Sequence, residues 1–464
     1  MLFRQQAEQI MNLIQKKKIA QGKPSSKLEW WDLSLIGTGA VIGAGFFLGT
    51  ALSIRQAGPS LMIAYVLGGI TSFLVFSALA DMFANDPQEG SFRVYAKKAY
   101  GHYMGFISGW IYWVAGVLIM SAEVTALAIF SQLWFPDIPL WAFAAIYSFM
   151  GLAIILLGVK DFGRIESLFG VIKISALVIF ILFGILFASG LIGAQETPAT
   201  NLPLSAGWGW FPNGMAGTWS AMIFVLFSYG GIEVMGILLT ELKDKRETGK
   251  TGRVMFVSLT LVYTLALLFI FLMVPWQSIN LSKSPFVTAL SLFGLSFVDS
   301  LLNAIIICAA FSTMVGALFG VTNVMVSLAN DEDAPHFLSH RNKKGVPIHA
   351  LSLSGLGLFI AIIFSFLLPD TVYEYLATAA GVMLILNWII ILGSQLRNKP
   401  GYEKTRRQVE YTMPGYPYSS YFAIGLIILT IAGTILSENE RIGVLASLGF
   451  VGLIYAYSKI RINI

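Results

Sequence analysis

The chain has 464 residues, of which 56% are hydrophobic and only 12% are charged. Water-soluble proteins average about 25% charged residues, so this composition excludes a soluble enzyme and a soluble nucleic-acid binder. At about 20 apolar residues per crossing, the apolar residues would fill about twelve transmembrane helices. The single cysteine, Cys308, excludes an intramolecular disulfide and a cysteine-based metal cage.

Apolar runs long enough to cross a bilayer follow one another along the whole chain. Lipid offers no partner for an unpaired backbone amide, and the runs lack the alternation of a β-barrel, so each is expected to be a helix. The sequence therefore predicts an all-α membrane protein with 12 transmembrane helices. The runs begin near Asp32, Ser60, Tyr103, Leu140, Ser167, Gly217, Val254, Val298, Ala350, Val372, Tyr421 and Arg441.

The placement of the positive charges predicts the orientation. With a cytoplasmic N-terminus, 26 of the 30 Lys and Arg residues fall on the cytoplasmic side and three fall outside. This asymmetry follows the positive-inside rule and predicts a plasma-membrane protein with both termini in the cytoplasm. The net charge of +5 is then a result of topology, so no nucleic-acid partner is expected.

The polar, basic N-terminal tail, residues 1–28, lacks the pattern of a signal peptide, so the first span is expected to stay uncleaved. Its apolar residues Ile10, Met11, Leu13 and Ile14 precede three lysines. They fit either a short amphipathic helix on anionic lipid or a loosely ordered tail. Both interpretations stay open.

Glycines interrupt the first and sixth apolar runs. The first has five glycines in the thirteen residues from Gly37 to Gly49, and the sixth has Gly230 and Gly231 just before Glu233. Each glycine costs about 1 kcal/mol relative to alanine in a helix interior. Close helix packing would also explain the first run taken alone. Interruptions at corresponding places in two halves instead indicate a transporter site, where exposed amides and carbonyls bind a carboxylate and an ammonium.

Ionisable residues inside the predicted spans are site candidates, because burying a charge in lipid is costly. Lys173 is the one basic residue within a span, and Glu123 and Glu233 are the acids singled out. Lys173 could equally snorkel toward the cytoplasm, and Glu233 could simply cap the amides of a broken helix. The residues alone leave these alternatives open.

The chain resembles bacterial amino acid permeases of the amino acid–polyamine–organocation superfamily over nearly all its length after Leu28. The resemblance implies a LeuT-type core of 5+5 inverted repeats, residues 29–415, with repeats at 29–190 and 216–397. Helices 11 and 12 and a short cytoplasmic C-terminus would follow at 416–464. The motifs that carry it are Gly43–Phe46, Phe227–Glu233, Pro87–Ser91 with Tyr95-Ala96 and Gly101, Gly109-Trp110 with Trp113, Glu123, Phe162-Gly163 with Ile172-Lys173, and Ala334-Pro335 with Gly345–Pro347.

The resemblance also implies a substrate site. The substrate carboxylate would bind the amides of Ala44 and Gly45, its ammonium would bind the carbonyls of Val41, Phe227 and Gly230, and Phe227 would gate the outer path. The full implied substrate-binding set is Val41, Gly43, Ala44, Gly45, Phe227, Tyr229, Gly230, Glu233 and Glu123.

Lys173 resembles the lysine that replaces a sodium ion in proton-coupled members of the family, so proton coupling through Lys173 is implied. Ser312 is the expected coupling partner on span eight, with its neighbour Thr313 as the other candidate. Span eight departs from the family pattern by losing hydroxyls and a charge, which favours a neutral substrate side chain. The departures are Val315, Gly316, Phe319 and Asn323.

The implied function is a secondary carrier that imports an L-α-amino acid with a proton by alternating access. An amino acid exchanger without proton coupling is the alternative, and a membrane amino acid sensor is a weaker one. The chain is not expected to be an enzyme, and its expected partners are the amino acid and membrane lipid. No cofactor besides the coupling proton is expected, and no metal, although His336 and His340 have i, i+4 spacing. The sequence does not indicate the oligomeric state.

Overall fold

The computed structural model describes residues 28–88, 92–157, 162–193, 209–239, 242–294, 296–405 and 411–462. Within these ranges the chain is helical almost throughout, and an isolated parallel bridge joins Leu28 to Leu242. The N-terminal residues 1–27 lie outside the described part, so the interpretation of the tail stays a prediction.

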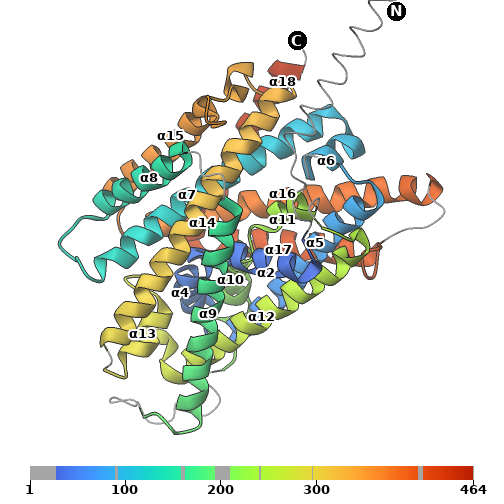
Figure 1. Cartoon of the computed structure of the whole chain (residues 1–464). Helices are drawn as coiled ribbons and strands as arrows, with labels where there is room; N and C mark the ends of the chain where they lie inside the picture. Colours follow the sequence, from blue (N-terminus) through green and yellow to red (C-terminus); the bar gives the residue numbers. More distant parts are fainter. Residues whose placement is uncertain are drawn as a thin grey trace, which may run out of the picture.

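The α-helices follow the predicted runs in chain order (Figure 1). They are α2 (Trp30–Val41), α3 (Ala44–Phe47), α4 (Gly49–Ala57), α5 (Leu61–Asn85), α6 (Phe92–Tyr100), α7 (His102–Gln132), α8 (Leu140–Leu157), α9 (Phe162–Ala188), α10 (Gly214–Ser228), α11 (Ile232–Leu238), α12 (Thr248–Met273), α13 (Pro285–Ser291), α14 (Ser296–Asn330), α15 (Ile348–Leu367), α16 (Val372–Thr405), α17 (Tyr418–Leu436) and α18 (Glu438–Ile462).

Ten helical segments in the described ranges are long and apolar enough to cross a membrane. The expected first and sixth spans have no uninterrupted helix of that length, because the first is divided among α2, α3 and α4 and the sixth between α10 and α11. The all-helical membrane architecture is therefore confirmed, whereas the count of twelve crossings stays a prediction.

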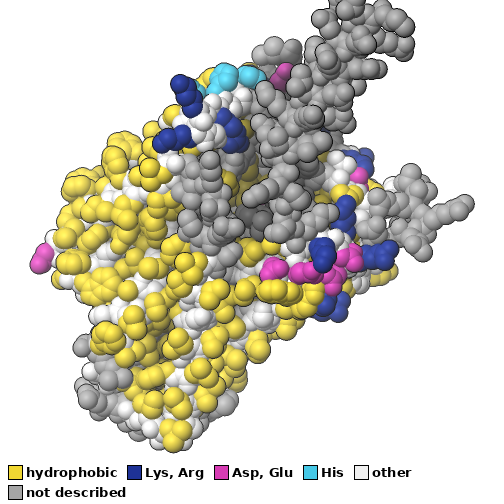
Figure 2. All heavy atoms as spheres, viewed as in Figure 1, with side chains coloured by type: hydrophobic (Ala, Val, Ile, Leu, Met, Phe, Trp, Pro, Cys, Tyr) yellow, Lys and Arg dark blue, Asp and Glu magenta, His cyan; other side chains and the backbone are white. Residues whose placement is uncertain are grey.

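The outer surface of the helices is apolar. Phe149 is 78% exposed, and many other aliphatic and aromatic side chains of the long helices are also exposed. Hydrophobic side chains cover the broad middle of the face in Figure 2, while most of the visible charged side chains gather toward its margins. Such a surface requires a hydrocarbon solvent, so the chain is a multi-pass membrane protein.

The two divided helices lie in the middle of the helix assembly (Figure 1). α2 packs against α9 and α12, while α10 packs against α4, α5 and α16. The long helix α7 contacts α3, α14 and α16. Because other helices surround both divided ones, their interrupted backbone is shielded from the apolar surface.

Candidate substrate and coupling site

The first helix is interrupted where its glycines predicted. α2 ends at Val41, and the next two residues are extended, with φ −72° and ψ 110° at Ile42 and φ −144° and ψ −164° at Gly43. α3 then begins at Ala44. We call Ile42 and Gly43 the first break.

A carboxylate from another helix caps the amide end of the first break. The Ala44 amide donates to both oxygens of Glu123, at 3.1 and 3.0 Å, and the Gly45 amide also bonds to this carboxylate. The exposed amides at a helix start attract anions. Gly43 makes room for the carboxylate, because a Cβ at that position would lie 2.6 Å from Oε1 of Glu123. Glu123 therefore accepts hydrogen bonds from the amides that the family resemblance assigns to the substrate carboxylate.

Lys173 holds the carbonyl end of the same break. Its fully buried ammonium donates to the carbonyl of Gly39 at 3.2 Å and to the hydroxyl of Thr313 at 3.0 Å. The Thr313 hydroxyl in turn lies 3.2 Å from the carbonyl of Ile42. Lys173 thus links α9 to α2 and α14, rather than extending to the cytoplasm. Ser312, the expected partner, is also buried, and its coupling role stays a prediction.

The sixth apolar run contains the second break, Tyr229 to Gly231, between α10 and α11. Gly231 has φ 106°, a conformation that strongly favours glycine. The hydroxyl of Tyr229 lies 3.1 Å from both the Tyr65 carbonyl and the Thr260 hydroxyl. Tyr229 therefore directs its hydroxyl toward α5 and α12.

Glu233 lies in the first turn of α11, two residues after the second break. Its carboxylate accepts a hydrogen bond from the indole nitrogen of Trp388 on α16. Both side chains are buried. The acid thus forms part of the packing between α11 and α16.

The two breaks lie side by side. A Cβ on Gly45 would lie 3.1 Å from the Phe227 ring and 3.3 Å from the Cα of Ser228, and one on Gly231 would lie 3.6 Å from Val41. The structure therefore brings the predicted residues Val41, Gly45 and Phe227 together. Their roles in substrate binding, like those of Gly43, Ala44, Tyr229, Gly230, Glu233 and Glu123, stay predictions.

Aromatic rings pack tightly beside this junction. The ring of Phe46 stacks on that of Tyr263, with centroids 3.7 Å apart and an interplanar angle of 15°. The hydroxyl of Tyr373 donates to the carbonyl of Ala44 at 3.0 Å, and that of Tyr263 donates to Ser228 at 3.3 Å. Helices α12 and α16 thereby contribute donors to the backbone around both breaks.

A second buried lysine, Lys399, lies near the end of α16, and the sequence analysis did not single it out. Helix α16 continues to Thr405 and contains an apolar stretch long enough to cross a membrane. Lys399 is buried there and pairs with the buried Asp81 of α5 at 2.6 Å.

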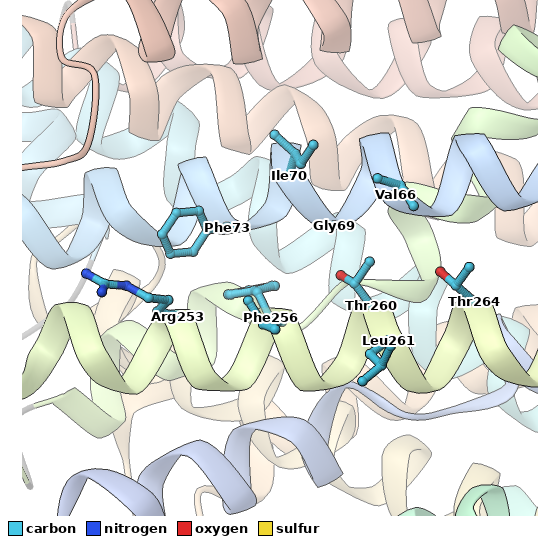
Figure 3. Close-up of a pocket in the computed structure, with 10 residues that line it drawn as sticks. Val66, Gly69, Ile70, Phe73, Arg253, Phe256, Thr260, Leu261 and Thr264 are labelled. Carbon is cyan, nitrogen blue, oxygen red and sulfur yellow. The ribbon is translucent and has the colours of Figure 1, made fainter. Parts of the chain in front are cut away.

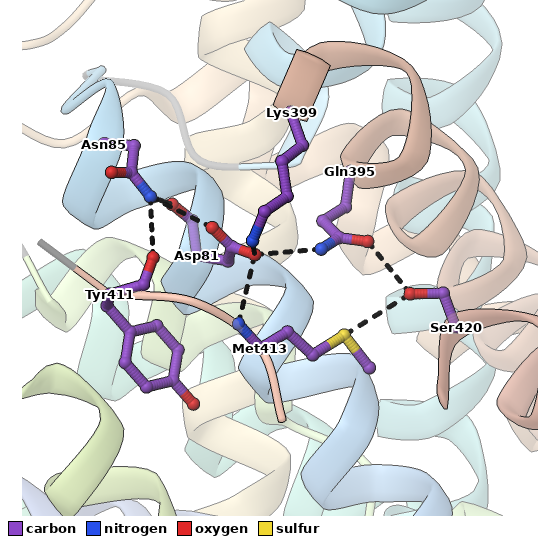
Figure 4. Close-up of polar contacts among 7 residues, drawn as sticks. All are labelled: Asp81, Asn85, Gln395, Lys399, Tyr411, Met413 and Ser420. Atoms are coloured by element: carbon purple, nitrogen blue, oxygen red, sulfur yellow. Dashed lines mark hydrogen bonds and ion pairs between the residues drawn. The ribbon is translucent and has the colours of Figure 1, made fainter. Parts of the chain in front are cut away.

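Asp81 accepts several further hydrogen bonds (Figure 4). The Gln395 amide and the Met413 backbone amide donate to it at 2.9 and 3.1 Å, and the Asn85 amide donates at 2.9 Å. The cluster joins α5 and α16 to the segment that leads into α17. An acid within the second apolar run was the available sequence signal for it, but Lys399, Gln395 and Met413 lie more than 300 residues away.

The long apolar helices around two broken ones define a polytopic membrane transporter, and comparisons with known proteins assign the family. The amino acid permease family profile matches residues 32–463. The chain therefore belongs to the amino acid permease family, as the resemblance in its motifs indicated.

Individual bacterial relatives align over most of the chain. It is 37% identical over 434 residues to the Bacillus subtilis (strain 168) transporter YcgH, covering 93% of this chain and 94% of the relative. It is 30% identical over 448 residues to the amino-acid permease AapA of the same organism, covering 96% of each. It is 33% identical over 366 residues to the aromatic amino acid transport protein AroP of Escherichia coli (strain K12), covering 77% of this chain and 78% of the relative.

Proposed function

We propose that this protein is a secondary carrier that imports an L-α-amino acid together with a proton, by alternating access, across the plasma membrane with both termini in the cytoplasm. The observation that carries the proposal is the pair of helix breaks lying side by side in the core. Backbone amides and carbonyls that lie outside regular helix at the breaks suit the two charged ends of a zwitterion.

Substrate binding would replace the internal carboxylate. The Ala44 amide donates to Glu123 in the structure, and the carboxylate of an amino acid offers the same chemistry. The neighbouring side chains of Phe227 and Leu384 are apolar, which supports a neutral substrate. The names of AapA and AroP also support an amino acid as the transported class.

Lys173 supports proton coupling. Its ammonium holds the carbonyl end of the first break through Gly39 and Thr313, and it also interacts electrostatically with Glu123 at the amide end. If Lys173 loses its proton, it becomes neutral and its electrostatic attraction to Glu123 is lost. The protonation state of Lys173 would therefore alter the stability of the break that binds the substrate.

Uptake into proteoliposomes tests this proposal. A panel of labelled amino acids is offered with and without an outside-acid pH gradient, and the gradient should drive accumulation of at least one. Lys173→Ala should abolish the gradient-driven accumulation while exchange of internal for external substrate persists. Lys343→Ala, which removes an exposed lysine, serves as the control.

Two results would contradict the coupling. Accumulation by Lys173→Ala that still follows the pH gradient would place coupling elsewhere. Wild-type uptake that ignores the gradient but requires internal amino acid would identify an exchanger.

A further inference from the structure

A groove runs along the outer surface between α5 and α12 (Figure 3). It has a volume of about 390 Å³. We call it the α5–α12 groove. Its lining residues are Val66, Gly69, Ile70, Phe73, Arg253, Phe256, Val257, Thr260, Leu261 and Thr264.

The groove is apolar and faces the lipid. Val66, Ile70, Val257 and Leu261 are exposed along it. Its floor lies at Gly69, where a Cβ would be only 2.1 Å from the hydroxyl of Thr260. The two helices thus meet closely at the floor and diverge toward the surface, which leaves a channel that a flexible hydrocarbon chain can fill.

Arg253 gives one end of the groove a positive charge. It is exposed, and no carboxylate in the described part of the chain forms an ion pair with it. In Figure 3 its guanidinium lies at the end of the row that leads through Phe256 and Thr260 to Thr264. The segment 243–253 that leads to this end of the groove has five basic and two acidic residues, so its net charge is positive.

The length of the groove matches one leaflet of a bilayer. Arg253 and Thr264 are separated by eleven residues of helix, or about 16 Å at 1.5 Å per residue. Half of a hydrocarbon core of about 30 Å is about 15 Å. A lipid whose headgroup is at Arg253 can therefore lay one acyl chain along the whole groove.

We propose that the α5–α12 groove binds one phospholipid with an anionic headgroup, its phosphate on Arg253 and one acyl chain between the two helices. Guanidinium groups bind phosphate oxygens with charge-assisted hydrogen bonds, and basic residues at this depth attract anionic lipid. A zwitterionic headgroup adds a cationic amine beside the same basic cluster, so it should bind less well.

This lipid would also contact the framework of the second break. Thr260 lines the groove, and its hydroxyl lies 3.1 Å from the hydroxyl of Tyr229. A bound acyl chain would support α12 at the point where it holds this break. A lipid in the groove would thus influence the second break from the outer surface, without entering the substrate site.

Native mass spectrometry of the purified full chain, titrated with phosphatidylglycerol or phosphatidylcholine, tests the proposal. The wild type should prefer phosphatidylglycerol, and Arg253→Gln should reduce this preference about fivefold. Lys343→Gln removes an exposed charge from a loop that does not line the groove and should keep the preference.

A second pair of variants tests the acyl-chain channel. Val257→Trp should fill the groove and remove one bound phosphatidylglycerol. Ile179→Trp is the matched control on α9, because Val257 and Ile179 are both 63% exposed. Equal binding of both lipids by the wild type, or unchanged phosphatidylglycerol binding by Arg253→Gln and Val257→Trp, would overturn the proposal. This measurement does not require transport, so it stands apart from the test of the carrier function.

Discussion

The two helix breaks differ in where their polar partners come from. At the first break, the Ala44 amide is capped by Glu123, a residue 79 positions away on α7, and the carbonyl end is held by Lys173 of α9 through Gly39. At the second break, the acid Glu233 belongs to α11 itself, and Tyr229 reaches α5 and α12 with a neutral hydroxyl.

This difference shows that the first break depends on tertiary packing for its charge balance. Glu123 and Lys173 come from helices that pack around α2 and α3, so a displacement of these helices would change the electrostatic environment of the first break. The second break needs a glycine with positive φ, and its partners on other helices, such as Tyr65 and Trp388, are neutral. The first break is therefore the better candidate for the part that responds to substrate and proton.

The largest expected effect comes from closing the space between the breaks. Gly45→Leu should reduce uptake to background, because even a Cβ there would press on Phe227 and Ser228. Uptake of labelled amino acid into proteoliposomes measures the effect. Purification of the variant as a monodisperse protein checks that it still inserts and folds. Gly425→Leu is the control, since a Cβ at Gly425 meets no atom within 4 Å. Normal uptake by Gly45→Leu would show that the substrate does not use this junction.

A smaller effect should distinguish the two acids. Glu123→Gln retains one carbonyl oxygen, but an amide nitrogen replaces the second oxygen that accepts from Ala44. Leaving a buried donor without a full acceptor costs about 1–3 kcal/mol, so the free energy of unfolding without substrate should fall by about that amount. Denaturant titration in mixed micelles measures it.

Glu233→Gln is the matched variant at the second break. It retains a carbonyl oxygen that can accept from Trp388, so its loss of stability should be below about 1 kcal/mol. Equal losses for the two variants would mean that the breaks do not differ in their dependence on charge.

The smallest effects should come from deleting neutral hydroxyls. Tyr373→Phe removes the donor to Ala44 at the first break, and Tyr229→Phe removes the hydroxyl near Tyr65 at the second. A neutral hydrogen bond contributes about 0.5–1.5 kcal/mol, so each variant should lose about 1 kcal/mol of unfolding free energy in the same titration. A much larger loss for either one would show that neutral groups also hold that break.

The sequence predicted the helices and both breaks because these depend on local properties. Apolar runs determine which segments enter the membrane, and glycines such as Gly43 and Gly231 weaken the helix where they occur. The family could likewise be inferred from ordered motifs, and the matching profile confirms it.

The partners of the buried charges could not be predicted in the same way. Glu123 was a candidate because an acid inside a span is unusual. Only the packing of α7 against α3 shows that its carboxylate accepts a hydrogen bond from the Ala44 amide. Lys399 was not singled out, because the sequence does not show that Asp81 of α5 pairs with it. Such pairings depend on residues that are distant in sequence.

The Asp81 cluster has a consequence for how α5 and α16 can separate. Separating α5 from α16 at this end would strand a carboxylate that now accepts from Lys399, Gln395, Met413 and Asn85. Leaving a buried charge without its partner costs about 3–5 kcal/mol unless water reaches it. Any movement that separates these two helices must therefore hydrate Asp81 or give it new partners.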